Sequence, residues 1–188
     1  MLQQKMQQLL TDYVAAYTAQ QKVPQAEYVQ QWQAPIYQGK GSAESDRIAW
    51  QPVRQSSPLN FADLEQALGL VFHADIKRWF QHWYAADLQC TFQQHPLSLL
   101  QVQCAEDGER LLANIAGHVL MKRRLKQSET VFIGLSDEHD DLLISVDNQT
   151  AEVGLEWIGK PQHEILAQNL VEFIDKLEVN HQIISEIR

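Results

Sequence analysis

Side chains that could bind a metal or perform catalysis are scattered along this chain. The seven histidines, at positions 73, 82, 95, 118, 139, 163 and 181, are never closer than nine residues, so no local pair has the spacing of zinc ligands. Cys90 and Cys104 lack the C-x-x-C spacing and any local signature of a catalytic nucleophile, and no serine lies in a G-x-S-x-G motif. We therefore expect no metal site, no cofactor and no covalent catalysis.

One segment and one histidine need separate interpretation. The segment from Asp137 to Asp141 is the densest group of potential ligands, but it lacks the spaced oxygens and central glycine of a calcium loop. We interpret it as a solvated turn. His118 lies among the apolar residues of a predicted helix, which favours a buried imidazole hydrogen-bonded to a neighbour. The alternative is a small enzyme with an unrecognised pocket that contains His118 and Asp87.

The charge of the chain is unevenly distributed. The net charge is −9, which argues against nucleic acid as a partner and opposes binding to anionic lipid. Residues 129–188 contain 3 basic and 13 acidic residues, whereas residues 1–128 are nearly neutral. Such an asymmetry either attracts basic segments or serves solubility alone. The basic run from Lys122 to Lys126 either binds acidic groups or, as we favour, complements the C-terminal end of a helix.

Apolar periodicity predicts several helices that could position these residues. Residues 2–20 and 106–126 have apolar side chains at three- and four-residue steps, so each predicts an amphipathic helix. Asn60 is placed to cap a helix that ends at Gly69, by accepting from the amide of Asp63. A further helix is predicted over 74–84, with an aromatic face that we expect in the core. A closing helix is predicted after Pro161, through Leu177.

The remaining patterns predict strands. Residues 88–93 and 97–103 alternate between apolar and polar side chains around the turn formers His95 and Pro96, which predicts a hairpin that would place both cysteines on strands. Residues 131–135, 142–146 and 152–157 predict three strands of an antiparallel meander. Regular βαβ alternation is missing, so we expect an α+β fold, with an antiparallel or mixed sheet and helices packed on one side of it.

The chain length and composition favour one domain over residues 1–188. Residues 1–21 form the N-terminal amphipathic helix, and residues 22–59 are expected to pack along the body as loop, with a short helix after Pro24. The segment 1–13 lacks the apolar run of a signal peptide, and no stretch is suited to crossing a bilayer. We therefore expect the protein to stay in the cytoplasm.

Several short stretches, in this order and over more than 120 residues, resemble the family of the SecY-interacting protein Syd of Gram-negative bacteria. They are Trp50-Gln51-Pro52, Ala86-Asp87, Glu106-Asp107, Gly117-His118, Arg124-Leu125-Lys126, Phe132-Ile133, Asn169-Leu170 and Glu172-Phe173.

The resemblance implies a fold related to the SUKH superfamily and a non-catalytic protein, loosely bound to the cytoplasmic side of the inner membrane through the translocon subunit SecY. It also implies an acidic concave docking surface and a role in checking or restraining the translocase. Basic cytoplasmic loops of a membrane protein would suit such a surface. The acidic residues at or beside the matching stretches are the candidates for this surface: Asp46, Glu65, Asp87, Glu106 and Asp107.

Overall fold

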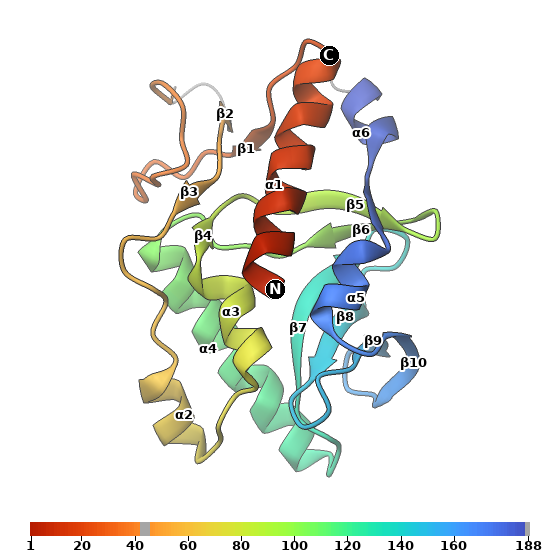
Figure 1. Cartoon of the computed structure of the whole chain (residues 1–188). Helices are drawn as coiled ribbons and strands as arrows, with labels where there is room; N and C mark the ends of the chain where they lie inside the picture. Colours follow the sequence, from red (N-terminus) through yellow and green to blue (C-terminus); the bar gives the residue numbers. More distant parts are fainter. Residues whose placement is uncertain (42–45, 187–188) are drawn as a thin grey trace.

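The computed structural model describes residues 1–41 and 46–186 and centres on a curled, seven-stranded antiparallel sheet (Figure 1). The strand order is β10-β9-β8-β7-β6-β5-β11, so six consecutive strands form a meander and the last strand joins the far edge. This confirms the predicted α+β class. The strands are β5 (Leu88–Phe92), β6 (His95–Leu99), β7 (Thr130–Ser136), β8 (Leu142–Asp147), β9 (Val153–Trp157), β10 (Gln162–Ala167) and β11 (Leu177–Val179).

The first hairpin turns earlier than predicted. Gln93 and Gln94 both have positive φ, at 50° and 72°, which makes a two-residue turn whose twist matches that of the strands. His95 and Pro96 therefore belong to β6, where they pair with Phe92 and Thr91. The prediction that His95 and Pro96 form the turn was wrong, because the hairpin register places the reversal two residues before them.

The long helix α4 (Ala105–Arg124) packs on one face of the sheet through β7, with Ile115 and Val119 fully buried. Its termini carry the predicted charges, since Glu106 and Asp107 lie in the first turn and three cations lie in the last. Cys104 immediately precedes this helix, so only Cys90 lies on a strand, although both thiols are buried.

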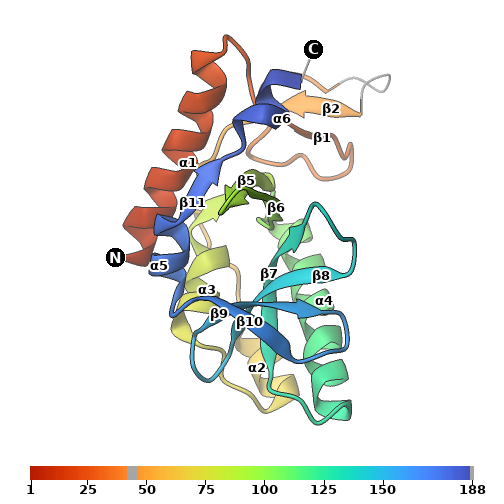
Figure 2. The ribbon, with the colours of Figure 1, turned by 90° about the vertical axis from the view of Figure 1, so that its right-hand side faces the viewer.

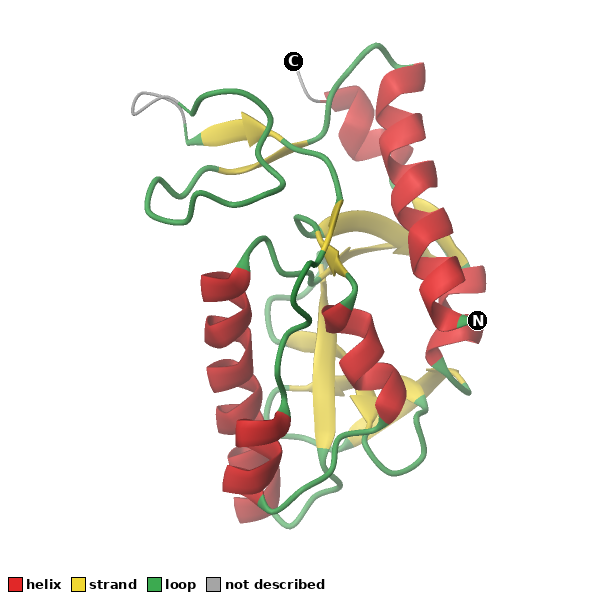
Figure 3. Cartoon of the chain, turned by 60° about the vertical axis from the view of Figure 1, so that its left-hand side comes forward, coloured by secondary structure: helices red, strands yellow, loops and turns green. Residues whose placement is uncertain are grey.

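Helices lie on both sides of the sheet and not on one side as predicted (Figure 3). The N-terminal helix packs against α3 and α5, which lie on the side away from α4. Trp79 and Phe80 of α3 are fully buried, which confirms the predicted core role of this aromatic face. One hydrophobic core runs from Leu2 to Ile184. The other helices are α1 (Leu2–Ala19), α2 (Ala62–Leu68), α3 (Ala74–Gln81), α5 (Leu170–Asp175) and α6 (His181–Glu186).

The segment after Pro161 is a strand, and the predicted helix there was wrong. Residues 162–167 pair with β9 as β10, because the edge of β9 offers backbone partners that a helix would leave unpaired. The helix begins only after Asn169, whose side chain accepts from the amide of Glu172 at 3.0 Å. It ends at Asp175, and β11 then follows.

The segment 22–59 packs along the body, as predicted for its described residues. Trp50 is fully buried, and Tyr28, Trp32 and Tyr37 are half-buried. The expected helix after Pro24 is instead a strand that pairs with residues 47–49. Asn60 accepts from the amide of Ala62 and not from that of Asp63. The short strands are β1 (Gln25–Glu27), β2 (Arg47–Ala49), β3 (Val53–Arg54) and β4 (Trp83–Tyr84).

No helix within the described part of the chain is both long and apolar enough to span a membrane.

Candidate functional site

A hollow of about 210 Å³ opens between α4, the segment that follows β6 and the segment around β1. Three carboxylates line it, those of Glu27, Asp87 and Asp107, and Arg110 is the one cation among its described lining residues. We call this site the acidic hollow. At neutral pH its lining carries an excess of negative charge, so it is suited to an ammonium or guanidinium group.

Asp87 is held in the acidic hollow by the backbone. Its Oδ1 accepts from the amide of Gln101 at 2.9 Å, and its side chain remains accessible to water at the mouth of the hollow. Desolvation by the surrounding protein raises the pKa of Asp87 to about 6. The Gln101 amide opposes this increase, and the nearby Asp107 carboxylate adds to it. Asp87 is therefore mostly ionised at neutral pH, and an incoming cation would relieve its repulsion with Asp107.

Asp107 faces Asp87 from the first turn of α4. Its Oδ2 accepts from the amide of Gln103 at 3.0 Å. Burial raises the pKa of Asp107, whereas the Gln103 amide and the charge of Arg110 lower it. The Arg110 guanidinium lies over the ring of Trp32, 5.1 Å from its centroid. Both aspartates therefore keep one oxygen free of a backbone donor.

Gln103 also lines the hollow. Its Oε1 is buried and has no hydrogen-bond partner among residues 1–41 and 46–186. Buried amide oxygens are usually satisfied, so this atom is an exception, but it is closed to solvent and we assign it no ligand.

The other three predicted site residues lie in different surroundings. Glu106 is exposed next to Asp107 but is not among the described residues that line the hollow. Asp46 is exposed, and its carbonyl accepts from the amide of Tyr28, so it lies close to Glu27. Chain folding therefore brings Asp87 and Asp107 into one site and leaves Glu106 and Asp46 beside it.

Glu65 lies on α2 and is already paired. Its Oε1 accepts from Lys77 Nζ at 2.8 Å and from the amide of Phe72 at 2.9 Å. Burial opposes its ionisation, but these donors outweigh it and lower the pKa of Glu65. Sequence reasoning missed Glu27 and Arg110, which carry no local motif.

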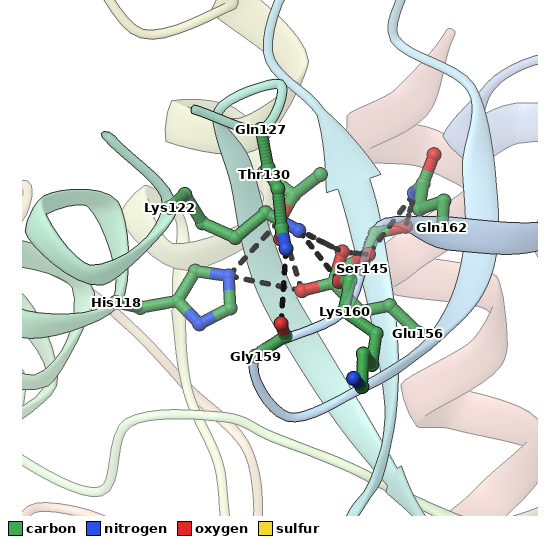
Figure 4. Close-up of polar contacts among 9 residues, drawn as sticks. All are labelled: His118, Lys122, Gln127, Thr130, Ser145, Glu156, Gly159, Lys160 and Gln162. Carbon is green, nitrogen blue, oxygen red and sulfur yellow. Dashed lines mark hydrogen bonds and ion pairs between the residues drawn. The ribbon is translucent and has the colours of Figure 1, made fainter. Parts of the chain in front are cut away.

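A second polar group, the buried cluster, lies between α4 and the sheet (Figure 4). Its centre is the fully buried carboxylate of Glu156, which accepts from Thr130 and from Ser145 Oγ at 3.0 Å. His118 Nε2 lies 3.0 Å from Glu156 Oε1, and Lys122 Nζ lies 3.2 Å from Oε2. Burial alone would raise the pKa of Glu156, but His118, Lys122 and Thr130 together lower it.

The buried cluster explains two residues that the sequence had singled out. His118 is a buried imidazole bonded to neighbours, as predicted; because Thr130 donates to Glu156, His118 Nε2 donates to Thr130 at 2.9 Å. Lys122 is buried and donates to the carbonyl of Lys160 at 2.9 Å, so it does not belong to an exposed basic run. His118 does not line the acidic hollow, whereas Asp87 does.

The fold and the acidic hollow define a small α+β protein whose candidate site is lined by acidic side chains. A family model for the Syd protein (SUKH-2) matches residues 3–179. Three relatives are each called Protein Syd. The one from Idiomarina loihiensis is 54% identical over 81% of this chain and 82% of its own length. The relative from Alteromonas mediterranea is 43% identical over 78% of this chain and 80% of its own length. The relative from Pseudoalteromonas atlantica is 40% identical over 81% of this chain and 82% of its own length. The chain belongs to the Syd family.

Proposed function

We propose that this chain is a non-catalytic binding protein that docks on SecY at the cytoplasmic side of the inner membrane and checks or negatively regulates the translocase. Membership of the Syd family supports the partner, and the acidic hollow is the observation that carries the docking mechanism. Three carboxylates, those of Glu27, Asp87 and Asp107, line it, and all of them are hydrogen-bond acceptors.

The chemistry of the partner fits this site. Cytoplasmic loops of membrane proteins are enriched in Lys and Arg, whose side chains carry only donors. A basic side chain in the acidic hollow would contact the free oxygens of Asp87 and Asp107. Arg110 is stacked on the ring of Trp32, and its single positive charge does not balance the three carboxylates of the hollow.

The five predicted docking residues contribute differently in this proposal. Asp87 and Asp107 make direct contacts, and Asp46 and Glu106 extend the negative field around the hollow. Glu65 contributes least, because Lys77 already neutralises it. Attachment to the membrane then depends on the protein partner, since the net charge of −9 opposes anionic headgroups.

The alternative of a small enzyme with a pocket around His118 and Asp87 has less support. His118 is enclosed in the buried cluster and does not line the acidic hollow that Asp87 lines, so a substrate in that hollow would not meet both side chains.

Binding to purified SecYEG in nanodiscs tests the proposal. The test variant combines Asp87→Asn with Asp107→Asn, and the control combines Asp12→Asn with Glu178→Gln, two exposed carboxylates on α1 and β11. Exposed ion pairs are each worth about 0.2 to 1 kcal/mol, so the hollow variant should bind about 2- to 30-fold more weakly. The control carries the same net charge and should lose much less.

A stronger perturbation reverses Asp87, Glu106 and Asp107 to Lys, which should weaken binding at least tenfold. Glu106 and Asp107 also stabilise the start of α4, so the melting curve of this variant must be recorded in parallel. Equal affinities of the hollow and control variants, together with normal binding by a folded triple variant, would refute docking through the hollow.

A further inference from the structure

A second hollow, of about 240 Å³, is lined in part by residues of β8, β9 and β10. Figure 2 shows these three strands in the foreground. Leu155 lines this hollow, and the adjacent Glu156 points into the buried cluster beneath α4; successive strand residues face opposite sides. We call this site the apolar cup. Its apolar lining consists of Phe92, Leu97, Leu142, Ile144, Leu155 and Leu166.

The walls of the apolar cup are fixed by the core. Phe92 and Ile144 are buried, and the ring of Phe92 stacks on that of Phe173 of α5 with centroids 5.5 Å apart. Such walls stay in place when the cup is empty, so binding costs little free energy for ordering them. The volume is below the roughly 300 to 1,000 Å³ of pockets for drug-sized ligands, and therefore suits a single bulky side chain.

The rim of the apolar cup is acidic. Glu138 enters from the turn after β7, and Glu164 enters from β10. Glu138 Oε2 lies 2.9 Å from Nδ1 of His95, whereas the Glu164 carboxylate has no hydrogen bond or ion pair within the described part of the chain. The described lining contains no Lys or Arg, so the negative charge of the rim is not balanced locally.

Charge and shape together define the ligand. We propose that the apolar cup is a second peptide-binding site, which takes one bulky apolar side chain from a segment that carries Lys or Arg on either side of it. The apolar side chain fills the cup, and the flanking cations meet Glu138 and Glu164. The site also gives a role to two carboxylates of residues 129–188, a segment whose described acidic residues do not line the acidic hollow.

Synthetic peptides test this site without SecY, so the outcome is independent of the proposed docking function. The probe is the peptide Gly-Arg-Phe-Arg-Gly, titrated into the isotope-labelled full chain while methyl resonances are followed by NMR. We expect shifts centred on Leu97, Ile144, Leu155 and Leu166. Two control peptides, Gly-Arg-Gly-Arg-Gly and Gly-Glu-Phe-Glu-Gly, should bind at least fivefold more weakly, because one lacks the apolar side chain and the other the cations.

Two variants and a matched control decide the interpretation. Leu166→Trp fills the cup from its half-buried wall and should abolish the methyl shifts. Glu138→Gln combined with Glu164→Gln changes only exposed groups and should weaken binding about 2- to 30-fold, at up to about fivefold for each exposed pair. The control that combines Asp12→Asn with Glu178→Gln alters the net charge equally, lies outside both hollows and should leave peptide binding unchanged.

Three results would overturn the proposal: no shifts at the methyl groups of the cup, equal binding of the phenylalanine and glycine peptides at these methyl groups, or equal affinities of the rim variant and the Asp12/Glu178 control. If Leu166→Trp does not fold, the rim variant still decides the outcome.

Discussion

Replacing Glu156 by glutamine should be the most damaging single polar substitution in this fold. Glutamine has the shape of glutamate, and its oxygen can still accept from Thr130 or Ser145. However, it removes the negative charge that compensates Lys122, whose side chain is only 1% exposed. The ammonium would then be buried with the Lys160 carbonyl as an acceptor but without the carboxylate that compensates its charge.

The expected cost follows from the burial of this pair. Removing one partner of a buried ion pair typically costs about 3 to 5 kcal/mol, because the remaining charge is uncompensated. That is a large part of the roughly 5 to 15 kcal/mol that stabilises an ordinary domain. For a chain of this size each kcal/mol lowers the melting temperature by about 2 to 4 °C. We therefore expect a decrease of about 6 to 20 °C for Glu156→Gln.

Chemical denaturation and thermal melting measure this effect against a matched control. Glu164→Gln makes the same chemical change on the neighbouring strand at an exposed site and should alter stability by less than about 0.5 kcal/mol. Lys122→Met should be less damaging than Glu156→Gln, because Thr130 and Ser145 still donate to Glu156 and His118 Nε2 still lies 3.0 Å from its Oε1. The double variant should be more stable than the sum of the two single effects predicts, because no unpaired charge is left.

The pH dependence gives a second readout of the same pair. The pKa of Glu156 is lower in the folded chain than in the unfolded chain, so its stabilisation is present at neutral pH and is lost as the pH falls below the ordinary glutamate range near ~4.3. The Glu156→Gln variant should lose less stability over this acidic range. A melting temperature within 2 °C of the wild type, or strictly additive effects in the double variant, would refute this account of the buried cluster.

Three further outcomes are expected. The raised pKa of Asp87 means that its ionised form is disfavoured in the fold, so Asp87→Asn should raise the melting temperature at pH 7.5. This gain should shrink as the pH falls through about 6 towards 4. An equal gain in melting temperature at pH 7.5 and pH 4 would contradict the prediction. Docking on SecYEG should weaken steeply between 0.1 M and 1 M salt, because the Debye length falls from about 10 Å to about 3 Å; a salt-independent affinity would point to an apolar contact. Gly154→Ala should destabilise the fold by about 1 to 3 kcal/mol, since a Cβ would lie 2.6 Å from the Glu164 carbonyl oxygen. Gly117→Ala, on the open face of α4, should stabilise the fold by roughly 0.5 to 1 kcal/mol. Equal melting temperatures for these two variants would contradict the packing.

The pattern of apolar residues was sufficient to predict those helices and strands whose formation depends mainly on their own residues. The helices α1 and α4 and the strands β7, β8 and β9 lie within one or two residues of their predicted positions, because each repeats its apolar side chains with the period of its own backbone. The buried state of His118 was predictable for the same reason, since it lies beside Ile115 and Val119 on the buried stripe of α4. The family was also recognisable, from short stretches distributed over most of the chain.

Elements that depend on a distant partner were not predictable in this way. The residues of β10 include consecutive apolar side chains that fit a helix equally well, and the open edge of β9 decided in favour of a strand. The turn at Gln93 and Gln94 uses left-handed conformations that favour glycine or asparagine, so only the register of the paired strands places it there.

The site depended on the tertiary structure most of all. The sequence marked Asp87, Glu106 and Asp107 as candidates, but the backbone hydrogen bonds to Gln101 and Gln103 determine that two of these carboxylates share a hollow. Lys122 appeared to belong to a basic run because its partner, Glu156, lies 34 residues further along the chain. Charge and periodicity are properties of neighbouring residues, whereas desolvation and ion pairing depend on which distant segments the fold brings into contact.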